Sequence, residues 1–258
     1  MRVAIVTGAA QGVGFATAQL FAKTGYTVIL NDLHALDVPL EKLRADGGSV
    51  HGMSGDVASE DFAIELAARI DRDYGAADVL VNNAGISLIV PAEETTLLQW
   101  QRIMSVNLQG PFLLAKHLGA QMLRRGCGSV VNVASVAGLA GISHRSAYNA
   151  SKHGLIGLTR TLAAEWGGRG VRVNAVCPGW IKTGMDVADQ SLGQYSDADI
   201  VNRVPLARFA RPEDVAAAIA YLADPRQSGF INGVSLPVDG GWIADASWDS
   251  LRVRTREN

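Results

Sequence analysis

Short apolar runs alternate with longer segments of helical spacing along most of the chain. Six runs have the length and composition of buried β-strands, at residues 2–7, 26–31, 78–82, 129–134, 171–176 and 234–238. Helical spacing occupies residues 14–24, 59–74, 97–124, 147–166 and 212–223. Helices that connect strands by right-handed crossovers produce a parallel sheet covered on both faces. The alternation therefore predicts an α/β fold, a doubly wound parallel sheet with helices on both faces.

The domain organisation follows from the absence of any linker. The 258 residues contain no Pro- or Ser-rich stretch, charge block or internal repeat that would separate two domains, and 48% of them are hydrophobic. We therefore predict one domain over residues 1–241. Residues 186–202 are polar and interrupted by glycine, which predicts a mobile excursion that folds over a substrate, and residues 242–258 form a C-terminal tail.

Charge, hydropathy and cysteine content exclude several classes of protein. Lys and Arg total 23 and Asp and Glu total 25, so a net charge of −2 leaves no basic surface for general nucleic-acid binding. No apolar run approaches the roughly 18 residues of a membrane helix, and no secretory signal is visible. Cys127 and Cys177 lack metal-site or disulfide-framework spacing. We expect a cytoplasmic protein with no metal site and no membrane or nucleic-acid partner.

A glycine-rich turn follows the first predicted strand. Glycine lets the backbone turn sharply and approach a pyrophosphate, whose charge is met by backbone N–H groups and the positive end of a helix dipole. The turn from Gly8 through Gln11, Gly12 and Val13 to Gly14 opens a predicted helix and so predicts dinucleotide binding. An ordinary strand-to-helix connection is the alternative.

The second predicted strand ends at an acidic residue, Asp32, followed by Leu33. Asp32 lies about 20 residues beyond the middle glycine, where a carboxylate can accept hydrogen bonds from both hydroxyls of an adenosine ribose. A 2′-phosphate would be repelled by that carboxylate, and no neighbouring arginine offsets it. The position therefore favours NAD, with a turn-capping aspartate as the alternative.

Three further polar residues form a candidate catalytic group. Tyr148 and Lys152 stand four apart in a helical segment, so their side chains share one face. Ser135 follows the predicted strand of residues 129–134, at the carboxyl end where parallel sheets bind ligands. Taken singly, the Tyr–Lys spacing is also typical of a solvated surface pair, and the serine is also typical of a turn cap.

Together these motifs resemble the short-chain dehydrogenase/reductase family. The resemblance extends from about residue 3 to residue 241, and the order and spacing of the motifs agree with the family pattern. It is carried by the glycine turn of residues 7–14, Asn82-Asn83-Ala84-Gly85, Asn107, Ser135, Tyr148 with Lys152, and Pro178-Gly179. It implies a Rossmann-like fold, a nicotinamide cofactor, and hydride transfer between a secondary alcohol and its ketone.

The resemblance also implies a role for each catalytic residue. Tyr148 would be the general acid/base, Ser135 would hold the substrate oxygen, and Lys152 would bind the nicotinamide ribose and lower the pKa of Tyr148. A free tyrosine with a pKa near 10 is a poor base at neutral pH, and each unit of lowering requires about 1.4 kcal/mol. Asn107 would support a water-linked proton path; a structural kink in its helix is the alternative.

Further dinucleotide contacts are implied on both sides of the cofactor. Asp56 and Val57 would contact adenine, and Ile181 and Thr183 would bind the nicotinamide carboxamide. The glycine turn, Asp32, Leu33, Tyr148 and Lys152 are already among the implied cofactor residues. The others are Asp56, Val57, Asn83, Ala84, Gly85, Pro178, Gly179, Ile181 and Thr183.

Substrate and assembly are less determined by the sequence. A secondary alcohol or ketone of modest size, including a polyol, sugar or cyclic alcohol, suits the motifs. His144 would contact it at the pocket mouth, with a solvated surface position as the alternative, and Trp180 and Met185 would add apolar walls. Long helices that are apolar on more than one face predict self-association, and the resemblance implies a homotetramer.

Three other functions remain open at this point. An NADPH-dependent carbonyl reductase would require a cationic pocket at Asp32. A non-catalytic protein that senses a dinucleotide would not need Ser135, Tyr148 and Lys152. A dehalogenase-like lyase on the same fold would not need the complete cofactor turn. The leading prediction is an NAD-dependent alcohol dehydrogenase or ketone reductase.

Overall fold

The computed structural model describes residues 2–182 and 196–247. Seven strands in this part of the chain form one parallel sheet in the order β3-β2-β1-β4-β5-β6-β7. They are β1 (Arg2–Thr7), β2 (Tyr26–Asp32), β3 (Val50–Ser54), β4 (Val79–Asn82), β5 (Gly128–Val133), β6 (Val171–Pro178) and β7 (Ser235–Val238). The order reverses between β1 and β4, and at such a switch point the carboxyl ends of the strands diverge to leave a ligand crevice.

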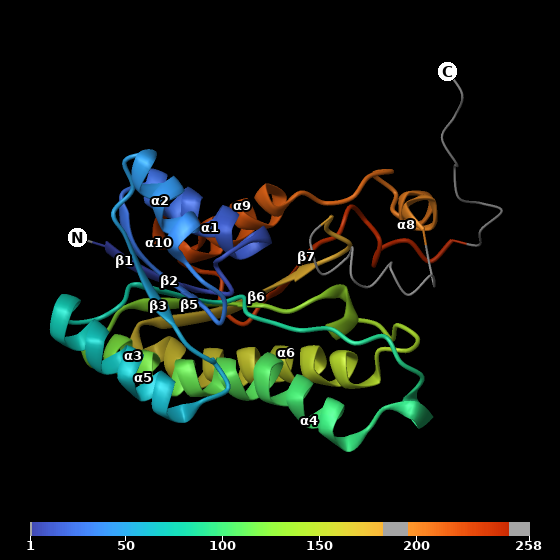
Figure 1. Cartoon of the computed structure of the whole chain (residues 1–258), viewed down its shortest axis with the longest axis horizontal. Helices are drawn as coiled ribbons and strands as arrows, with labels where there is room; N and C mark the ends of the chain where they lie inside the picture. The colour runs from blue at the N-terminus through green and yellow to red at the C-terminus, as the bar shows by residue number, and fades with distance from the viewer. Residues whose placement is uncertain (1, 183–195, 248–258) are drawn as a thin grey trace.

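Helices cover both faces of the sheet. One face carries α1 (Gly12–Lys23), α2 (Asp37–Ala45), α9 (Pro212–Ala223) and α10 (Pro225–Ser228). The other face carries α3 (Glu60–Tyr74), α4 (Leu97–Met104), α5 (Gly110–Arg125) and α6 (Ser146–Trp166), as Figure 1 shows. Short 3-10 turns lie at Ala92–Glu94, Val136–Gly138 and Gly167–Arg169. The predicted doubly wound α/β fold is confirmed.

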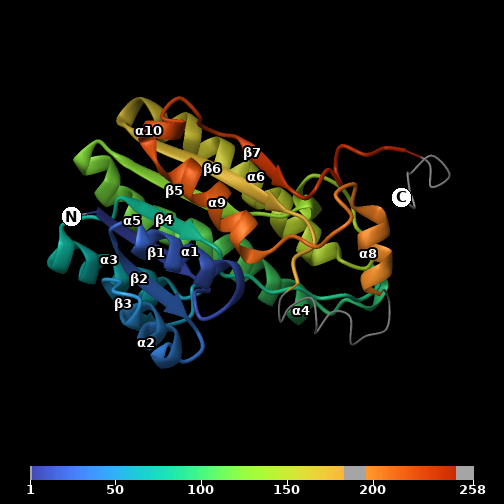
Figure 2. The same ribbon diagram turned by 90° about the horizontal axis from the view of Figure 1, so that it is seen from above.

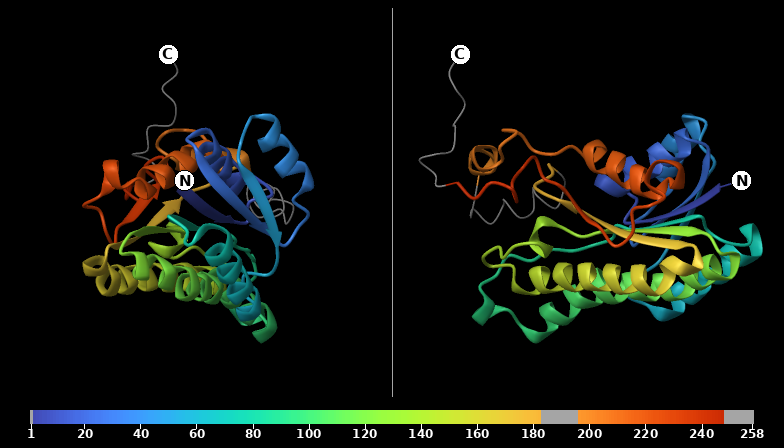
Figure 3. Two further views of the ribbon diagram at one scale, coloured as in Figure 1. Left: turned by 90° about the vertical axis from the view of Figure 1, so that its left-hand side faces the viewer. Right: turned by 180° about the vertical axis from the view of Figure 1, so that it is seen from behind.

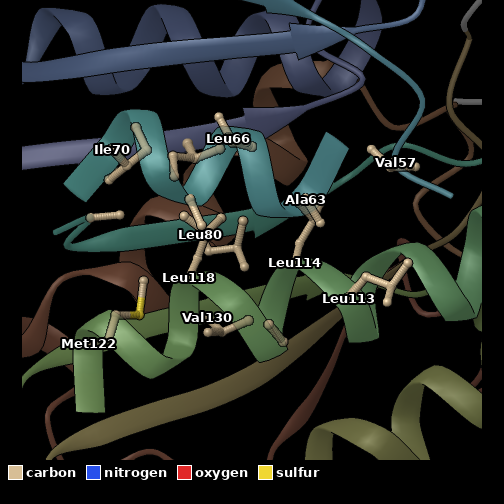
Figure 4. Packing of buried hydrophobic residues seen from close by; sticks show 14 of the residues in the cluster. Val57, Ala63, Leu66, Ile70, Leu80, Leu113, Leu114, Leu118, Met122 and Val130 are labelled. Atoms are coloured by element: carbon tan, nitrogen blue, oxygen red, sulfur yellow. The ribbon is translucent and has the colours of Figure 1, made fainter. Parts of the chain in front are cut away.

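Each face of the sheet has its own apolar core. On one side, residues of α3 and α5 interdigitate over β4 and β5, with Leu66, Leu80, Leu114 and Leu118 almost fully buried (Figure 4). On the other side, α1 packs over β1 and β2, and α9 packs beside it over β5 and β6. Burial of the strands on both faces explains why they are near-continuous apolar runs.

The edges of the sheet depart most from the predicted elements. Strand β3 and helix α2 lie at one edge and were not among the predicted elements. The sequence of β3 lacks the apolar run of a central strand: Val50 and Met53 are buried on opposite faces of the sheet, whereas His51 and Ser54 are exposed. At the opposite edge β7 contains Pro237, which an edge strand tolerates.

The predicted single helix over residues 97–124 is wrong in one respect. The chain forms α4, then a π-helical segment at Ser105–Gln109, then α5. Pro111 has no N–H to donate to the preceding turn, so the regular hydrogen-bond ladder is interrupted here. The π-helical segment includes Asn107, the residue for which a structural kink was the alternative to a catalytic role.

Helix α8 (Asp197–Arg203) begins within the predicted excursion of residues 186–202 and ends one residue beyond it. Ser196 and Asp199 form a capping box that starts it, a local signal which the irregular periodicity of the segment obscures. The helix lies at the end of the molecule opposite the N-terminus, as Figures 1, 2 and 3 agree. The rest of the predicted excursion, and residues 248–258 of the predicted tail, lie outside the described residues.

Candidate active site

The glycine turn forms the floor of a cleft at the carboxyl ends of the strands. Gly8 and Gly12 have φ values of 63° and 56°, which only glycine adopts without strain. A Cβ on Gly14 would lie 2.1 Å from the carbonyl oxygen of Gly8 and 2.6 Å from Nδ2 of Asn83. Glycine at this position therefore permits the start of α1 to approach the turn and β4 closely.

The start of α1 suits an anionic ligand. No side chain caps this helix at Gln11, and its first turn contains no acidic residue. Gln11, Gly12 and Val13 line the cleft, so the backbone N–H groups at the helix N-terminus lie along it. Such groups, with the helix dipole, bind phosphates. The open turn, the uncapped helix and Asp32 nearby fit a nicotinamide dinucleotide.

Asp32 lies at the end of β2 and lines the cleft with Leu33. Its Oδ2 accepts a hydrogen bond from the N–H of Ala10 at 2.9 Å, and its Oδ1 accepts one from the N–H of His34 at 3.0 Å. The carboxylate therefore caps two turns while it also borders the cleft. Turn capping and ribose binding, the two alternatives for Asp32, are compatible, because each carboxylate oxygen can accept a second hydrogen bond.

The next strand places a second carboxylate in the cleft. Asp56 accepts a hydrogen bond from the N–H of Ala58 and forms an ion pair with Arg102 at 2.9 Å, and Val57 lines the cleft beside it. Burial acts to raise the pKa of Asp56, but the hydrogen bonds from Ala58 and Arg102 outweigh it and lower that pKa. Asp56 is thus held as a carboxylate at the same end of the cleft as Asp32.

Residues after β4 join the glycine turn to the centre of the sheet. The Nδ2 group of Asn83 donates to the carbonyl oxygens of Thr7 and Gly8 at 2.8 and 3.0 Å. Asn83, Ala84 and Gly85 also line the cleft. Asn83 therefore clamps the turn from the side of β4 in addition to bordering the ligand space.

Ser135, Tyr148 and Lys152 converge on the same cleft from two elements. Ser135 follows β5, is buried, and its Oγ accepts a hydrogen bond from the N–H of Ala137. Tyr148 and Lys152 lie one turn apart on α6, with Nζ of Lys152 5.6 Å from the Tyr148 ring centroid. All three line the cleft. The spatial convergence that the chemistry requires is present.

Lys152 is fully buried and hydrogen-bonded. Its Nζ donates to the carbonyl oxygen of Val133 at 2.8 Å. Burial disfavours the charged amine and lowers its pKa from 10.5 to about 8. At neutral pH the group stays a cation beside the phenol of Tyr148. Cys177 nearby is different, because burial raises its pKa to about 11 and keeps the thiol protonated.

Asn107 is fully buried and is not among the described residues that line the cleft. Its Oδ1 accepts from the N–H of Ile86, and its Nδ2 donates to the carbonyl oxygen of Ile86 and to Oγ of Ser151. A Cβ on Gly85 would lie 3.3 Å from Asn107 Oδ1 and 3.5 Å from Lys152 Nζ. Asn107 therefore adjoins Lys152 across Gly85 and fixes the segment after β4 against α6.

The segment after β6 borders the other end of the cleft. Pro178, Gly179, Trp180 and Ile181 line it. The carbonyl oxygen of Trp180 accepts from the N–H of Ala210, which holds this turn against the chain before α9. Two further residues proposed for this region, Thr183 and Met185, lie outside the described residues.

Comparison with known proteins identifies the family of this fold and site. A family model described as enoyl-(acyl carrier protein) reductase matches residues 8–243. The chain belongs to the short-chain dehydrogenase/reductase family. The resemblance noted in the sequence is confirmed, and the protein is an oxidoreductase of this family.

Relatives within the short-chain dehydrogenase/reductase family oxidise different alcohols, as their names state. D-threitol dehydrogenase from Mycolicibacterium smegmatis is 39% identical over 93% of this chain and 92% of its own. Cis-4-hydroxycyclohexanecarboxylate dehydrogenase from Sinomonas cyclohexanicum is 40% identical over 94% and 97%. One longer relative is 42% identical, and the chain spans 44% of its length.

A solved structure matches over almost the full chain. It is described as an NAD(P)-dependent gluconate 5-dehydrogenase from Beutenbergia cavernae with NADP bound at low occupancy. The TM-score is 0.90 at 38% identity, and the match covers 95% of this chain and 97% of that one. The shared dehydrogenase/reductase fold therefore includes both edges of the sheet.

The substrate side of this short-chain dehydrogenase/reductase differs from the expectation. His144 is exposed and is not among the residues that line the cleft, whereas its neighbours Ile142 and Arg145 are. Arg145, and Arg102 on α4, line the cleft but were not among the residues predicted for it. For Arg145 the sequence does carry a signal, because it stands one helical turn before Tyr148. Arg102 has no such signal, because its place depends on how α4 packs.

Proposed function

We propose that the protein is an NAD-dependent oxidoreductase that interconverts a secondary alcohol and its ketone. The observation that carries this proposal is the convergence of Ser135, Tyr148 and Lys152 in one cleft that also contains the glycine turn and Asp32. The proposed substrate is a polyol, a sugar or a cyclic alcohol, and the names of the two relatives favour a polyol or a cyclic alcohol.

The proton steps are assigned to Tyr148. In oxidation its phenolate takes the proton of the alcohol O–H while the C–H hydrogen leaves with its electron pair, so the alcohol loses two electrons and becomes the ketone. A nicotinamide dinucleotide held along the glycine turn and Asp32 would supply the hydride acceptor in oxidation and the hydride donor in reduction. In reduction Tyr148 gives its proton to the forming alkoxide. Each direction therefore balances with one hydride and one proton.

Other side chains prepare this step. The positive charge of Lys152 stabilises the phenolate of Tyr148 over the neutral phenol, because an opposite charge within a few ångströms favours the ionised form. Ser135 is assigned to hold the substrate oxygen by a hydrogen bond from its hydroxyl. Asn107 is assigned to the proton path toward solvent, supported by its contact with Ser151 and its closeness to Lys152.

A substrate panel tests the proposal. Secondary alcohols, polyols and sugars are incubated with NAD and the full chain, and formation of NADH is followed by absorbance. We expect turnover of at least one class, and we expect Tyr148→Phe to reduce turnover at least about a hundredfold with NADH binding retained. Undiminished oxidation by Tyr148→Phe would remove the tyrosine from the mechanism. NADH binding without turnover of any substrate would favour a non-catalytic protein that senses a dinucleotide.

An NADPH-dependent reductase is the second candidate. The bound NADP of the gluconate 5-dehydrogenase structure favours it. Asp32 opposes it, since the carboxylate would repel a 2′-phosphate at the end of β2. The ratio of kcat/KM for NADH to that for NADPH decides between them.

Assembly and location are also proposed. A homotetramer is supported by apolar side chains left exposed on α4 and α5, among them Leu97, Leu98 and Phe112. Light scattering on the purified chain tests it, with a monomer as the contrary result. None of the described helices is long and apolar enough to cross a bilayer. A cytoplasmic location is proposed from the two cysteines, which are both unpaired.

A further inference from the structure

An arginine stands at the rim of the cleft, one helical turn before Tyr148. Arg145 is the residue from which α6 starts, and its carbonyl oxygen accepts from the N–H of Asn149 at 2.7 Å. It also forms a β-bridge with Val90. Its backbone is therefore fixed from two sides, by the helix and by the segment after β4.

The side chain of Arg145 is directed toward the phenol. Its guanidinium carbon lies 5.9 Å from the Tyr148 ring centroid, and its Nη1 donates to Oγ of Ser87 at 2.6 Å. The side chain is half-buried and lines the cleft together with Ile142 and Trp180. The positive charge of Arg145 is thus held beside Tyr148, the proposed general acid/base.

Charges are distributed unevenly along the cleft. Among its described lining residues the carboxylates are Asp32, at the end of β2, and Asp56, after β3, and Arg102 pairs with Asp56 at the same end. The end near β5 and α6 has two cations, Lys152 and Arg145, and otherwise mainly apolar neighbours. Lys152 already has an assigned role next to Tyr148. The transfer of hydride from a neutral alcohol requires no second cation there.

We propose that Arg145 binds an oxyanion on the substrate, so that the alcohol or ketone also bears a carboxylate or a phosphate group. The inference rests on the proposed function and specifies its substrate class. A guanidinium matches such groups because its planar fork donates two parallel hydrogen bonds to two oxygens. The hydrogen bond to Ser87 orients that fork, and the apolar neighbours strengthen the interaction by excluding water.

Matched pairs of substrates measure the effect in turnover. The acid of each pair is compared with its neutral partner: cis-4-hydroxycyclohexanecarboxylate with its carboxamide, gluconate with gluconamide, and glycerol 3-phosphate with glycerol. We expect kcat/KM to favour the anion by at least about 30-fold in one carboxylate pair or in the phosphate pair, as for a hydrogen bond to a charged group. Which pair responds distinguishes a carboxylate from a phosphate.

Substitution of the arginine tests whether it causes this preference. Arg145→Gln is expected to bring the anion-to-neutral ratio within about threefold, and Arg145→Lys to give an intermediate ratio, because a lysine keeps the charge without the fork. Arg160→Gln is the matched control, since Arg160 is an exposed arginine on the same helix. It should leave the ratio as in the wild type. A preference that survives Arg145→Gln overturns the proposal.

A binding measurement reads the same site without turnover. Calorimetry on the complex with NADH compares cyclohexanecarboxylate with cyclohexanecarboxamide, and phenyl phosphate with phenol. One anion should bind at least about tenfold more tightly than its neutral partner, and this difference should vanish in Arg145→Gln. Equal binding within both pairs overturns the inference about Arg145. Turnover of neutral alcohols without any anion preference defeats this inference while it leaves the proposed function intact.

Discussion

Asp32 combines a structural task with a place in the cofactor cleft. Its two carboxylate oxygens hold the N–H groups of Ala10 and His34, so the carboxylate is fixed in position before any ligand arrives. A fixed acceptor loses little conformational entropy on binding, which would strengthen the hydrogen bonds that the proposed role assigns to Asp32 with a ribose. The same rigidity prevents the carboxylate from turning away from a 2′-phosphate.

Removal of that charge should change the cofactor preference. Asp32→Ala is expected to lower kcat/KM for NADH and raise it for NADPH, so that the ratio shifts by at least about a hundredfold, because hydrogen bonds are lost and a repulsion disappears. Steady-state kinetics with both cofactors measure the shift. Asp37→Ala, an exposed aspartate at the start of α2, is the control. An unchanged ratio in Asp32→Ala would contradict the assignment.

Burial of Lys152 should be visible in the pH dependence of stability. Its pKa is about 8 in the folded chain, against an ordinary value of 10.5 once the chain unfolds, so between these values the unfolded chain binds more protons and stability rises with pH. Below pH 8 the buried charge lowers the free energy of unfolding by its full amount, about 3 kcal/mol. Lys152→Met should therefore be more stable than the wild type at pH 7, and this advantage should shrink by about 2 kcal/mol at pH 10.

Urea unfolding at the two pH values measures the advantage of Lys152→Met. Lys23→Met, at an exposed position near the end of α1, is the control and should show no comparable pH dependence. A stability difference for Lys152→Met that is the same at pH 7 and pH 10 would speak against a costly buried charge.

At the scale of elements, two junctions border the cleft. The first is the approach of α1 to β1 and β4 through Gly14, and the second is the π-helical segment at Ser105–Gln109, from which Val106 lines the cleft. A π-helical turn places Asn107 inside the protein, where its carboxamide replaces backbone partners for Ile86. Both junctions bring backbone of one element close to that of another, so they tolerate little added volume.

A methyl group on Gly14 tests the first junction. Gly14→Ala would place Cβ 2.1 Å from a backbone oxygen, so we expect a loss of about 1–3 kcal/mol in the free energy of unfolding and at least tenfold weaker NADH binding. Urea unfolding and NADH fluorescence measure these effects. Gly157→Ala on α6 is the matched control, because no atom lies within 4 Å of its Cβ. It should gain about 0.5–1 kcal/mol instead.

The elements differ in how well the sequence predicts them. Central strands such as β5 are recognisable because both faces are buried, whereas the edge strand β3 has too few apolar residues. Ser135, Tyr148 and Lys152 could be grouped because strand ends and i,i+4 spacing carry geometric information. Arg102 and the exposure of His144 depend instead on how α4 and the 141–145 loop pack, which no local pattern encodes.

At the scale of the molecule, the chain beyond β7 is connected to α8 and to the cleft. The indole of Trp242 lies 5.2 Å from that of Trp180, which lines the cleft, and Arg203 of α8 lies 4.9 Å from the Trp242 ring. Arg203 also pairs with Asp245, and Lys182 pairs with Asp197. Helix α8 is thereby attached to the rim of the cleft at both of its ends.

Loss of the central indole should loosen this attachment. Trp242→Ala removes an aromatic pair and a cation–π contact, worth about 1–3 kcal/mol together, so we expect KM for the substrate to rise about five- to tenfold. Steady-state kinetics measure it, with limited proteolysis near α8 as a second readout. Phe230→Ala, at a fully exposed aromatic residue, is the control. Equal KM values in the wild type and Trp242→Ala would show that α8 does not influence substrate binding.

The tryptophan fluorescence of Trp180 and Trp242 should report on ligand binding in the cleft. Trp180 lines the cleft and Trp242 packs against Trp180, so a ligand at this end of the cleft should alter the surroundings of both fluorophores. Indole emission overlaps the absorption of reduced nicotinamide, and energy transfer to NADH should quench it. Binding and release of the cofactor, and its redox state, should therefore be measurable from the intrinsic tryptophan fluorescence of the unlabelled enzyme.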